Sequence, residues 1–295
     1  MRQLNALILK TAFQMASQIK AKAVMIHADP LEDLRFEGRF SKKLDIYLLS
    51  RKKKLEGNGG DPEALLTYCK AVIPLPKTPL SRQGVIKFAT TTALSLNYLE
   101  QGDKVVCVAG SPELGFLDHI QILDTDKESE IVMGKGLRGM TESVDPEVFQ
   151  AVLLLSVELA QKGREGKPIG TIFVVGDSEK VLPLTKQMII NPFKGYAEEE
   201  RNVLSPSMKD TIREFAAMDG AFVISGDGIL LTAGAYLGAA MEDSNPPHGL
   251  GARHLAACGI THLTKAVAFV ISESSGDVRI FKNGKLLTQI EKTIK

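Results

Sequence analysis

The segment DGAFVISGDGILLT, residues 219–232, places an apolar run on each side of a Gly-Asp-Gly sequence. Residues 221–224 and 229–232 have strand composition, and Asp-Gly is a frequent turn between paired strands. The segment therefore predicts a β-hairpin. Asp219 and Gly220 stand at its start, after a helix expected over residues 207–217. Such a position suits a carboxylate that faces a ligand, although Asp219 taken alone is more simply a residue that caps or turns the chain.

A second feature follows the hairpin, where the loop MEDSNPPHGLG of residues 241–251 gives way to alanine-rich sequence. We expect a helix to begin near Ala252 or Arg253. A helix N-terminus has free backbone N–H groups and a positive dipole end, which favour phosphate, and arginine can donate two parallel hydrogen bonds to it. Arg253 and His254 in the first turn therefore indicate an anion site. The alternative is two cations on an exposed turn.

The C-terminal stretch predicts a strand over residues 265–272, a polar turn from Glu273, and a partner strand over 278–281, with a second hairpin at Asn283-Gly284. Glu273 is either a second acidic group near a metal or a plain turn carboxylate. Further upstream we expect a helix over 146–162, a buried strand over 171–175 and a helix over about 179–190. Together these elements predict an α/β domain.

The first part of the chain alternates helical and strand patterns. Its expected elements are a helix ending near Ile19, strands at 23–26, 44–49 and 71–75, a helix over 85–99, and a strand over 104–110. This alternation predicts a parallel, three-layer-like α/β domain, and we place the domain boundary between residues 126 and 127. The basic tetrad Arg51–Lys54 is interpreted as part of a solvated loop.

The sequence GKGLRG at residues 134–139 is a formal GxGxxG motif. A dinucleotide fingerprint needs a strand before it, a helix directly after it, and an acidic residue at the end of the next strand. Here the next helix starts only near Asp145, so we interpret the motif as a flexible connection. A Walker A motif is absent from the sequence.

Composition narrows the class of protein. The 295 residues include 36 Lys and Arg against 35 Asp and Glu, whereas a nucleic-acid-binding protein usually carries a clear basic excess. The three cysteines form no CxxC pair. The start, MRQLNALILKTAF, is typical of an amphipathic helix and not of a signal peptide, and no run of about 18 apolar residues occurs. We therefore expect a cytoplasmic protein without membrane or nucleic-acid partners.

Taken together, the carboxylate, the Arg-His pair and the glycine loops indicate a nucleotide-phosphate site, without indicating its reaction. The motifs Asp219-Gly220-Ala221, Gly251-Ala252-Arg253-His254 and Ser272-Glu273-Ser274-Ser275-Gly276, in this order, resemble the diadenylate cyclase (DAC) domain family. The resemblance covers residues 127–295. It implies a mixed central sheet surrounded by helices.

The resemblance further implies that two ATP molecules, each with Mn²⁺ or Mg²⁺, are held by facing domains of a homodimer or a higher oligomer and become cyclic di-AMP and two pyrophosphates. Asp219, Arg253 and His254 would be catalytic, and Asp219, His254 and Glu273 would be metal ligands. The implied ATP contacts are Gly220, Ala221, Gly234, Leu237, Gly251, Ala252, Arg253, His254, Ser272 and Glu273. The rival hypotheses are a catalytically inactive regulator that binds ATP or cyclic di-AMP, and an unrelated scaffold with chance motif matches.

The sequence departs from the family pattern at two positions. The family usually has Arg-His-Arg where this chain has Leu255 in third place, and usually Thr or Ser where this chain has Ala252. The first 126 residues resemble the C-terminal α/β domain of pyruvate kinase, which implies a sensor or an oligomerisation module.

Overall fold

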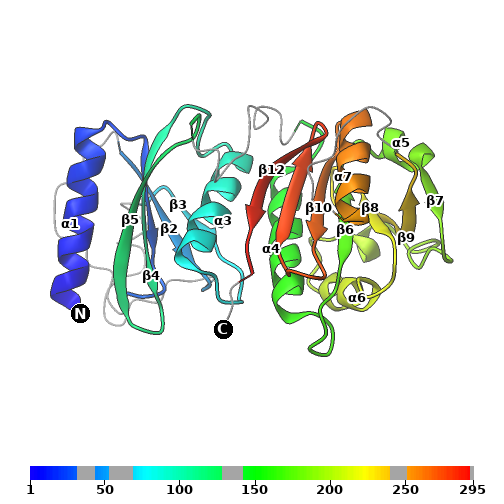
Figure 1. Cartoon of the computed structure of the whole chain (residues 1–295), viewed down its shortest axis with the longest axis horizontal. Helices are drawn as coiled ribbons and strands as arrows, with labels where there is room; N and C mark the ends of the chain where they lie inside the picture. The colour runs from blue at the N-terminus through cyan, green and yellow to red at the C-terminus, as the bar shows by residue number, and fades with distance from the viewer. Residues whose placement is uncertain (32–43, 53–68, 128–141, 240–250, 293–295) are drawn as a thin grey trace. The chain divides into compact units, whose positions relative to one another are not determined.

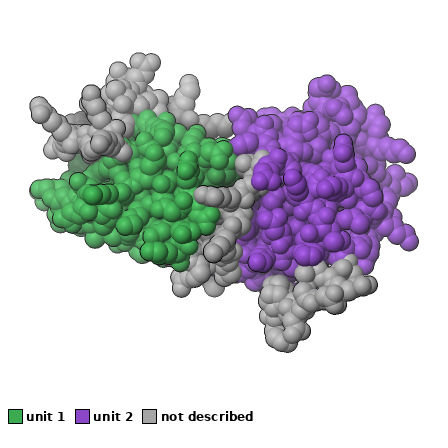
Figure 2. Space-filling view, turned by 90° about the horizontal axis from the view of Figure 1, so that it is seen from above, with its two compact units in different colours: residues 1–129 green, residues 130–295 purple. Residues whose placement is uncertain are grey.

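The computed structural model spans residues 1–295 and describes all of them except 32–43, 53–68, 128–141, 240–250 and 293–295. The chain forms two compact units, residues 1–129 and 130–295 (Figure 2). The GxGxxG motif and two residues of the basic tetrad, 53 and 54, lie outside the described residues. The boundary at 126/127 and the resemblance of the first unit to pyruvate kinase remain predictions.

The first unit contains a five-stranded sheet with the order β3-β2-β1-β4-β5. Its elements are α1 (Arg2–Gln18), β1 (Ala23–His27), β2 (Asp45–Ser50), β3 (Ala71–Pro74), α3 (Arg82–Ser95), β4 (Lys104–Ser111) and β5 (Phe116–Asp124). β1 pairs in parallel with β2 and β4, and β2 pairs in parallel with β3. The helices α1 and α3 cover opposite faces of the sheet, as the expected three layers require (Figure 1).

The expectation of a purely parallel first layer is wrong, because β5 runs antiparallel to β4. The sequence of this strand, FLDHIQILD, did not predict a strand because polar residues alternate irregularly with its apolar residues. β5 is an edge strand on which only Leu117 and Leu123 are buried. The apolar content of an edge strand is therefore too low for the run-based criterion that identified β1 and β4.

The second unit contains a seven-stranded sheet with the order β12-β11-β10-β6-β8-β9-β7. Its elements are α4 (Pro146–Lys162), β6 (Thr171–Val175), α5 (Ser178–Val181), η1 (Leu182–Leu184), β7 (Thr185–Gln187), η2 (Glu199–Arg201), α6 (Met208–Phe215), β8 (Ala221–Ile224), β9 (Leu230–Leu237), α7 (Ala252–Leu263), β10 (Val267–Ile271), β11 (Val278–Lys282) and β12 (Lys285–Ile290). Among these strands only β6 and β8 pair in parallel, which gives the expected mixed sheet.

The helix expected over residues 179–190 is wrong. α5 ends at Val181, a 3-10 turn follows, and residues 185–187 form the edge strand β7 against β9. Pro183 gives the physical reason, because proline lacks the N–H that a helix interior needs and its ring obstructs the carbonyl of the preceding turn. Beyond that break, Thr185 pairs with Leu237 of β9.

The core of the second unit lies on both faces of its sheet. On one face Ala257 and Ile260 of α7 pack with Ala268 and Val270 of β10. On the other face the ring of Phe149, from α4, lies 5.1 Å from that of Phe269. The alternation of side chains along β10 thus supports a helix on each side of the sheet.

None of the helices in the described ranges combines the length and the apolar character that crossing a bilayer demands. Cys69, Cys107 and Cys258 are free thiols.

Candidate nucleotide site

The functional candidates gather at one edge of the seven-stranded sheet, because the topology brings particular strand ends together. Gly170 immediately precedes β6, and Asp219 and Gly220 precede the parallel strand β8. β10 runs antiparallel to β6, so Ser272 and Glu273, which follow its C-terminal end, reach the same edge. The N-terminus of α7 completes this edge.

A pocket of about 830 Å³ lies at this edge. Ten of the residues predicted from the sequence line it, namely Asp219, Gly220, Ala221, Leu237, Gly251, Ala252, Arg253, His254, Ser272 and Glu273. Gly234 is not among the lining residues. The volume lies in the range of small-molecule sites.

Arg253 connects the two acidic side chains of the pocket. Its Nη1 donates to Oε2 of Glu273 at 3.0 Å, and its Nη2 lies 3.4 Å from Oδ1 of Asp219. Both carboxylates are well exposed, and the guanidinium is about one third exposed. These charges therefore remain accessible, and an incoming phosphate can compete for the guanidinium.

Gly170 makes room for this arginine. A Cβ at residue 170 would lie 2.6 Å from Nη1 of Arg253 and 2.9 Å from Cβ of Glu273. Gly170 was not among the site residues predicted from the sequence. Its contact with Arg253 joins two segments that are distant in the chain, so no local pattern could predict it.

Gly220 has a structural reason of its own to be glycine. Its φ is +106°, and a Cβ there would lie 2.6 Å from the carbonyl carbon of Gly234. Gly234 in turn packs against Ile189, whose Cγ1 would be 2.4 Å from an added Cβ. Gly220 thus permits the start of β8 to approach β9 closely, and Gly234 leaves room for the side chain of Ile189.

His254 occupies the first turn of α7 and is only 6% exposed. Its Nε2 is 2.8 Å from Nη1 of Arg279, and its Nδ1 is buried without a hydrogen-bond partner among the described residues. Burial lowers the pKa of this imidazole to about 4, and the nearby charges of Arg279 and Arg253 act in the same direction, against a smaller opposing effect of Asp277. His254 is therefore neutral at physiological pH.

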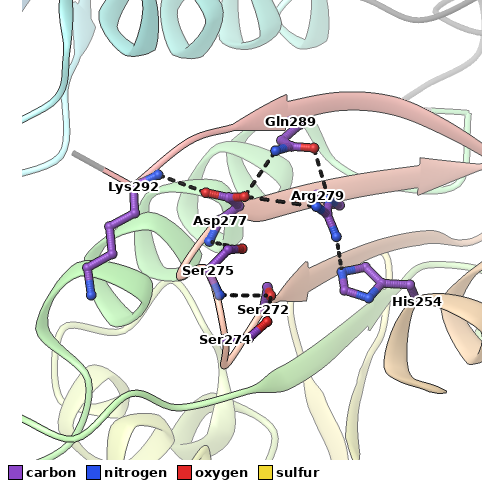
Figure 3. A network of polar contacts seen from close by, with 8 residues as sticks. All are labelled: His254, Ser272, Ser274, Ser275, Asp277, Arg279, Gln289 and Lys292. Atoms are coloured by element: carbon purple, nitrogen blue, oxygen red, sulfur yellow. Dashed lines mark hydrogen bonds and ion pairs between the residues drawn. The ribbon is translucent and has the colours of Figure 1, made fainter. Parts of the chain in front are cut away.

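Arg279 of β11 lines the pocket but was not among the residues predicted from the sequence. Its Nε donates to Oε1 of Gln289 at 2.9 Å, and its Nη2 is 3.9 Å from Oδ2 of Asp277 (Figure 3). The available signal was a cation in the apolar strand VRIF of residues 278–281. An inward-facing arginine in a strand requires partners, and here the partners belong to the adjoining hairpin strand and α7.

The pocket also has an apolar wall that sequence reasoning missed. Its members include Ile172, Met188, Tyr236 and Ile271. Met188 and Tyr236 remain more than half exposed although they are large and apolar in character. Such a surface suits a flat, weakly polar group such as a nucleobase.

Comparison with known proteins places this geometry in a family. The sequence is 35% identical to the diadenylate cyclase of Methanocaldococcus jannaschii over 208 residues, 70% of this chain and 66% of that protein. It is 35% identical to the diadenylate cyclase of Haloferax volcanii over 218 residues, 72% of this chain and 78% of that protein. The chain belongs to the diadenylate cyclase family.

The sequence model of one family, described as DisA bacterial checkpoint controller nucleotide-binding, matches residues 158–286 of this cyclase-family chain. The matched range contains Asp219, Arg253, His254 and Glu273. The chain spans just under two thirds of the length of the Methanocaldococcus protein. A crystal structure of DacA from Staphylococcus aureus is 24% identical, with a TM-score of 0.32 over 48% of this chain and 84% of that chain.

The family implies a divalent cation together with ATP, and the donors of the pocket can be compared with that requirement. Within the described ranges, no three His, Cys, Asp or Glu side chains converge on one point. Two carboxylates, Asp219 and Glu273, do flank Arg253. Mg²⁺ is commonly held by one or two carboxylates and the phosphates of its substrate. The acidic pair therefore fits a cation that arrives with the nucleotide.

Proposed function

We propose that this chain is a diadenylate cyclase that converts two ATP molecules into cyclic di-AMP and two pyrophosphates. The observation that carries the proposal is the meeting of Asp219, Arg253 and Glu273 in one pocket of a chain that belongs to this family. The reaction forms two bonds, because the ribose 3′ oxygen of each ATP becomes bonded to the α-phosphorus of the other. At each α-phosphorus the bond to pyrophosphate breaks, and each 3′ hydroxyl releases its proton.

The side chains divide this work by their charge and position. Arg253 and the N-terminus of α7 bind the phosphates and stabilise the negative charge that develops on them. Asp219 accepts the 3′ hydroxyl proton or orients that hydroxyl, since it is the more exposed of the two carboxylates that line the pocket. The apolar wall around Met188 and Tyr236 holds the adenine.

Asp219 and Glu273 would hold the divalent cation, Mn²⁺ or Mg²⁺. When bound, the cation supplies charge neutralisation at the phosphates. Arg253 must then leave at least one of its carboxylate partners, and the phosphates provide it with new acceptors. The exposed ion pairs make this exchange inexpensive in free energy.

One pocket holds only one of the two reacting nucleotides, so we propose a homodimer of facing domains, alone or within a higher oligomer. In-line attack requires both nucleotides to be oriented together. The specific activity should therefore fall on dilution below the dimer dissociation constant. A constant specific activity in a sample shown to be monomeric by light scattering would contradict this assembly. The three free thiols fit a reducing compartment, and we place the protein in the cytoplasm.

The direct test is incubation of the purified chain with ATP and Mn²⁺ or Mg²⁺, followed by mass spectrometry of the nucleotides. Cyclic di-AMP and pyrophosphate in a 1:2 ratio are the expected products. ATP binding by calorimetry without any turnover would overturn the enzyme assignment and favour a binding regulator. The absence of both binding and turnover would favour an unrelated scaffold.

A further inference from the structure

We propose that Arg279 is a positioning residue: it holds His254 with its proton on Nδ1 and its Nε2 lone pair engaged, so that His254 serves the nucleotide as a hydrogen-bond donor and not as a metal ligand. This inference deepens the proposed function and rests on it for the identity of the nucleotide. It revises one expectation from the sequence, in which His254 was also a metal ligand.

The assignment of the proton follows from the chemistry of the two side chains. A guanidinium carries only donors and stays protonated in proteins. Nη1 of Arg279 lies 2.8 Å from Nε2 of His254, so Nε2 must be the acceptor. An acceptor nitrogen bears no proton. A neutral imidazole has one N–H, and in His254 that group is therefore Nδ1–H.

The same geometry excludes His254 from the ligands of a cation. Histidine binds metals through an unprotonated nitrogen. In His254 the lone pair of Nε2 already accepts from Arg279, and Nδ1 carries the proton. The carboxylates of Asp219 and Glu273 then remain as the ligands that the pocket offers.

Nδ1–H is a donor that lacks an acceptor in the described part of the chain. This donor lies at the start of α7, where a Cβ at residue 251 would be 3.9 Å from Nδ1. Gly251 and His254 both line the pocket. Unpaired buried donors are rare in folded proteins and call for a partner. A phosphate oxygen at this helix N-terminus would supply the acceptor.

Arg279 is itself held in place, which is what a positioning residue requires. Gln289 accepts from Nε at 2.9 Å, and the Nε2 amide of Gln289 donates to Asp277 at 3.0 Å. The other oxygen of Asp277 accepts from the backbone N of Lys292 at 3.1 Å. These contacts tie the guanidinium to the β11–β12 hairpin (Figure 3). Its direction toward His254 is therefore set by the fold before any nucleotide binds.

The first experiment observes the tautomer directly in the full chain labelled with ¹⁵N-histidine. Long-range ¹H–¹⁵N spectra at pH 7.5 should show a protonated Nδ1 and a bare Nε2 for His254, whose signals are assigned by their disappearance in His254→Asn. Arg279→Met should shift the tautomer toward Nε2–H. The separate variant Arg279→Lys, which keeps a cationic donor, should have the Nδ1–H tautomer of the wild type. Gln289→Leu should act in the direction of Arg279→Met with a smaller effect. A bare Nδ1 in the wild type, or a tautomer insensitive to Arg279→Met in the folded protein, would overturn the proposal.

A second arm asks what His254 binds. Mg²⁺ with a non-hydrolysable ATP analogue should shift the Nδ1–H signal and leave Nε2 hydrogen-bonded to Arg279. A Nε2 signal displaced by the cation, together with a broken hydrogen bond to Arg279, would make His254 a ligand and overturn the proposal. Neither spectrum depends on turnover. A wild type that makes no cyclic di-AMP but has the Nδ1–H tautomer would contradict the proposed function and leave the proton assignment standing.

A double-mutant cycle separates positioning from a general structural role. Arg279→Met should lower kcat/KM about 10- to 100-fold in the wild type, but less than about threefold in His254→Asn, since Asn retains a donor near the Nδ1 position and lacks the ring that Arg279 orients. Arg164→Met is the control, because Arg164 is a half-exposed arginine that pairs with Glu214 at 2.8 Å and does not line the pocket. It should keep wild-type kinetics. Additive losses in the cycle would contradict the proposal.

Discussion

Arg253 and Asp219 lie 34 residues apart in the sequence, and Nη2 of the arginine is 3.4 Å from Oδ1 of the aspartate. The pair joins the N-terminus of α7 to the start of β8. The carboxylate is 86% exposed and the guanidinium about one third exposed, and ion pairs in contact with solvent contribute only about 0–1 kcal/mol to stability. The pair therefore contributes little to the stability of the fold, and it places accessible charges in the pocket, which a binding site for a charged ligand requires.

Asp219→Asn should abolish cyclic di-AMP formation and leave the fold intact. The carboxylate is 86% exposed, so its loss costs little stability, whereas removal of a proton acceptor at the reacting centre should lower the rate at least about 100-fold. Turnover by mass spectrometry and thermal unfolding measure the two effects. Asp210→Asn is a matched control, because Asp210 is 85% exposed and pairs with Arg213 at 2.7 Å outside the pocket. Unchanged turnover in Asp219→Asn would contradict the role of Asp219.

Arg253→Met should weaken ATP binding. Hydrogen bonds to charged groups are worth about 1.5–3 kcal/mol, which corresponds to roughly 10- to 150-fold in the dissociation constant. The loss of ATP affinity should exceed this range if Asp219 and Glu273 are left without the guanidinium that pairs with both of them. Calorimetric titration is suitable, since the chain has no Trp for intrinsic fluorescence. Arg213→Met serves as the control on a surface arginine, and equal ATP affinity in the two variants would contradict a phosphate contact by Arg253.

Gly170→Ala should reduce activity through Arg253. The added methyl would lie 2.6 Å from Nη1 of Arg253 and 2.9 Å from its Cζ, so the guanidinium must move away from Glu273. Two of the three obstructed atoms belong to the end of a flexible side chain, and the third is Cβ of Glu273 beyond the end of β10. The fold should therefore survive with a local shift, and the rise in KM should resemble that of Arg253→Met. Steady-state kinetics and far-UV circular dichroism measure both. Wild-type KM in a folded variant would mean that Gly170 has no influence on the position of the arginine.

The parts of the site that sequence could predict are those with a local signal. The start of α7 was visible where Gly and Pro give way to alanine, and Asn283 and Gly284 have the positive φ values, +51° and +70°, that their hairpin turn requires. Asp219 and Glu273 lie next to strand ends, and a strand end can be predicted from the position at which an apolar run begins or stops. Their roles came from the family resemblance.

The parts that sequence missed depend on tertiary pairing. Arg279 is one cation in an apolar strand until the β10–β11 register sets it beside α7 and its hydrogen bond with His254 forms. Met188 lines the pocket wall and lies beyond Pro183, where the helix expected from the sequence ends. The apolar residues after Pro183 had suggested that this helix continues. Such contacts follow from which strands become neighbours, and composition does not carry that information.

Acidification should destabilise the protein through His254. The pKa of the folded imidazole is about 4 against an ordinary value of 6.5, so between these values the unfolded chain binds a proton that the folded chain does not. Stability is therefore fully present above pH 6.5 and is lost as the pH falls toward 4, by up to about 1.4 kcal/mol per pH unit for this group. Burial of the imidazole opposes this protonation most strongly, and the charges of Arg279 and Arg253 oppose it as well.

The comparison of wild type with His254→Asn isolates this contribution from those of other titrating groups. Urea unfolding followed by circular dichroism at pH 7 and at pH 5 gives the free energy of unfolding of each. The wild type should lose about 2 kcal/mol more than the variant over this interval, since His254→Asn has no proton to exclude. Equal losses would mean that the folded imidazole accepts a proton as readily as the unfolded one. In that case Nε2 could not be the settled acceptor of Arg279 at mildly acidic pH, and the neutral donor state of His254 would be confined to higher pH.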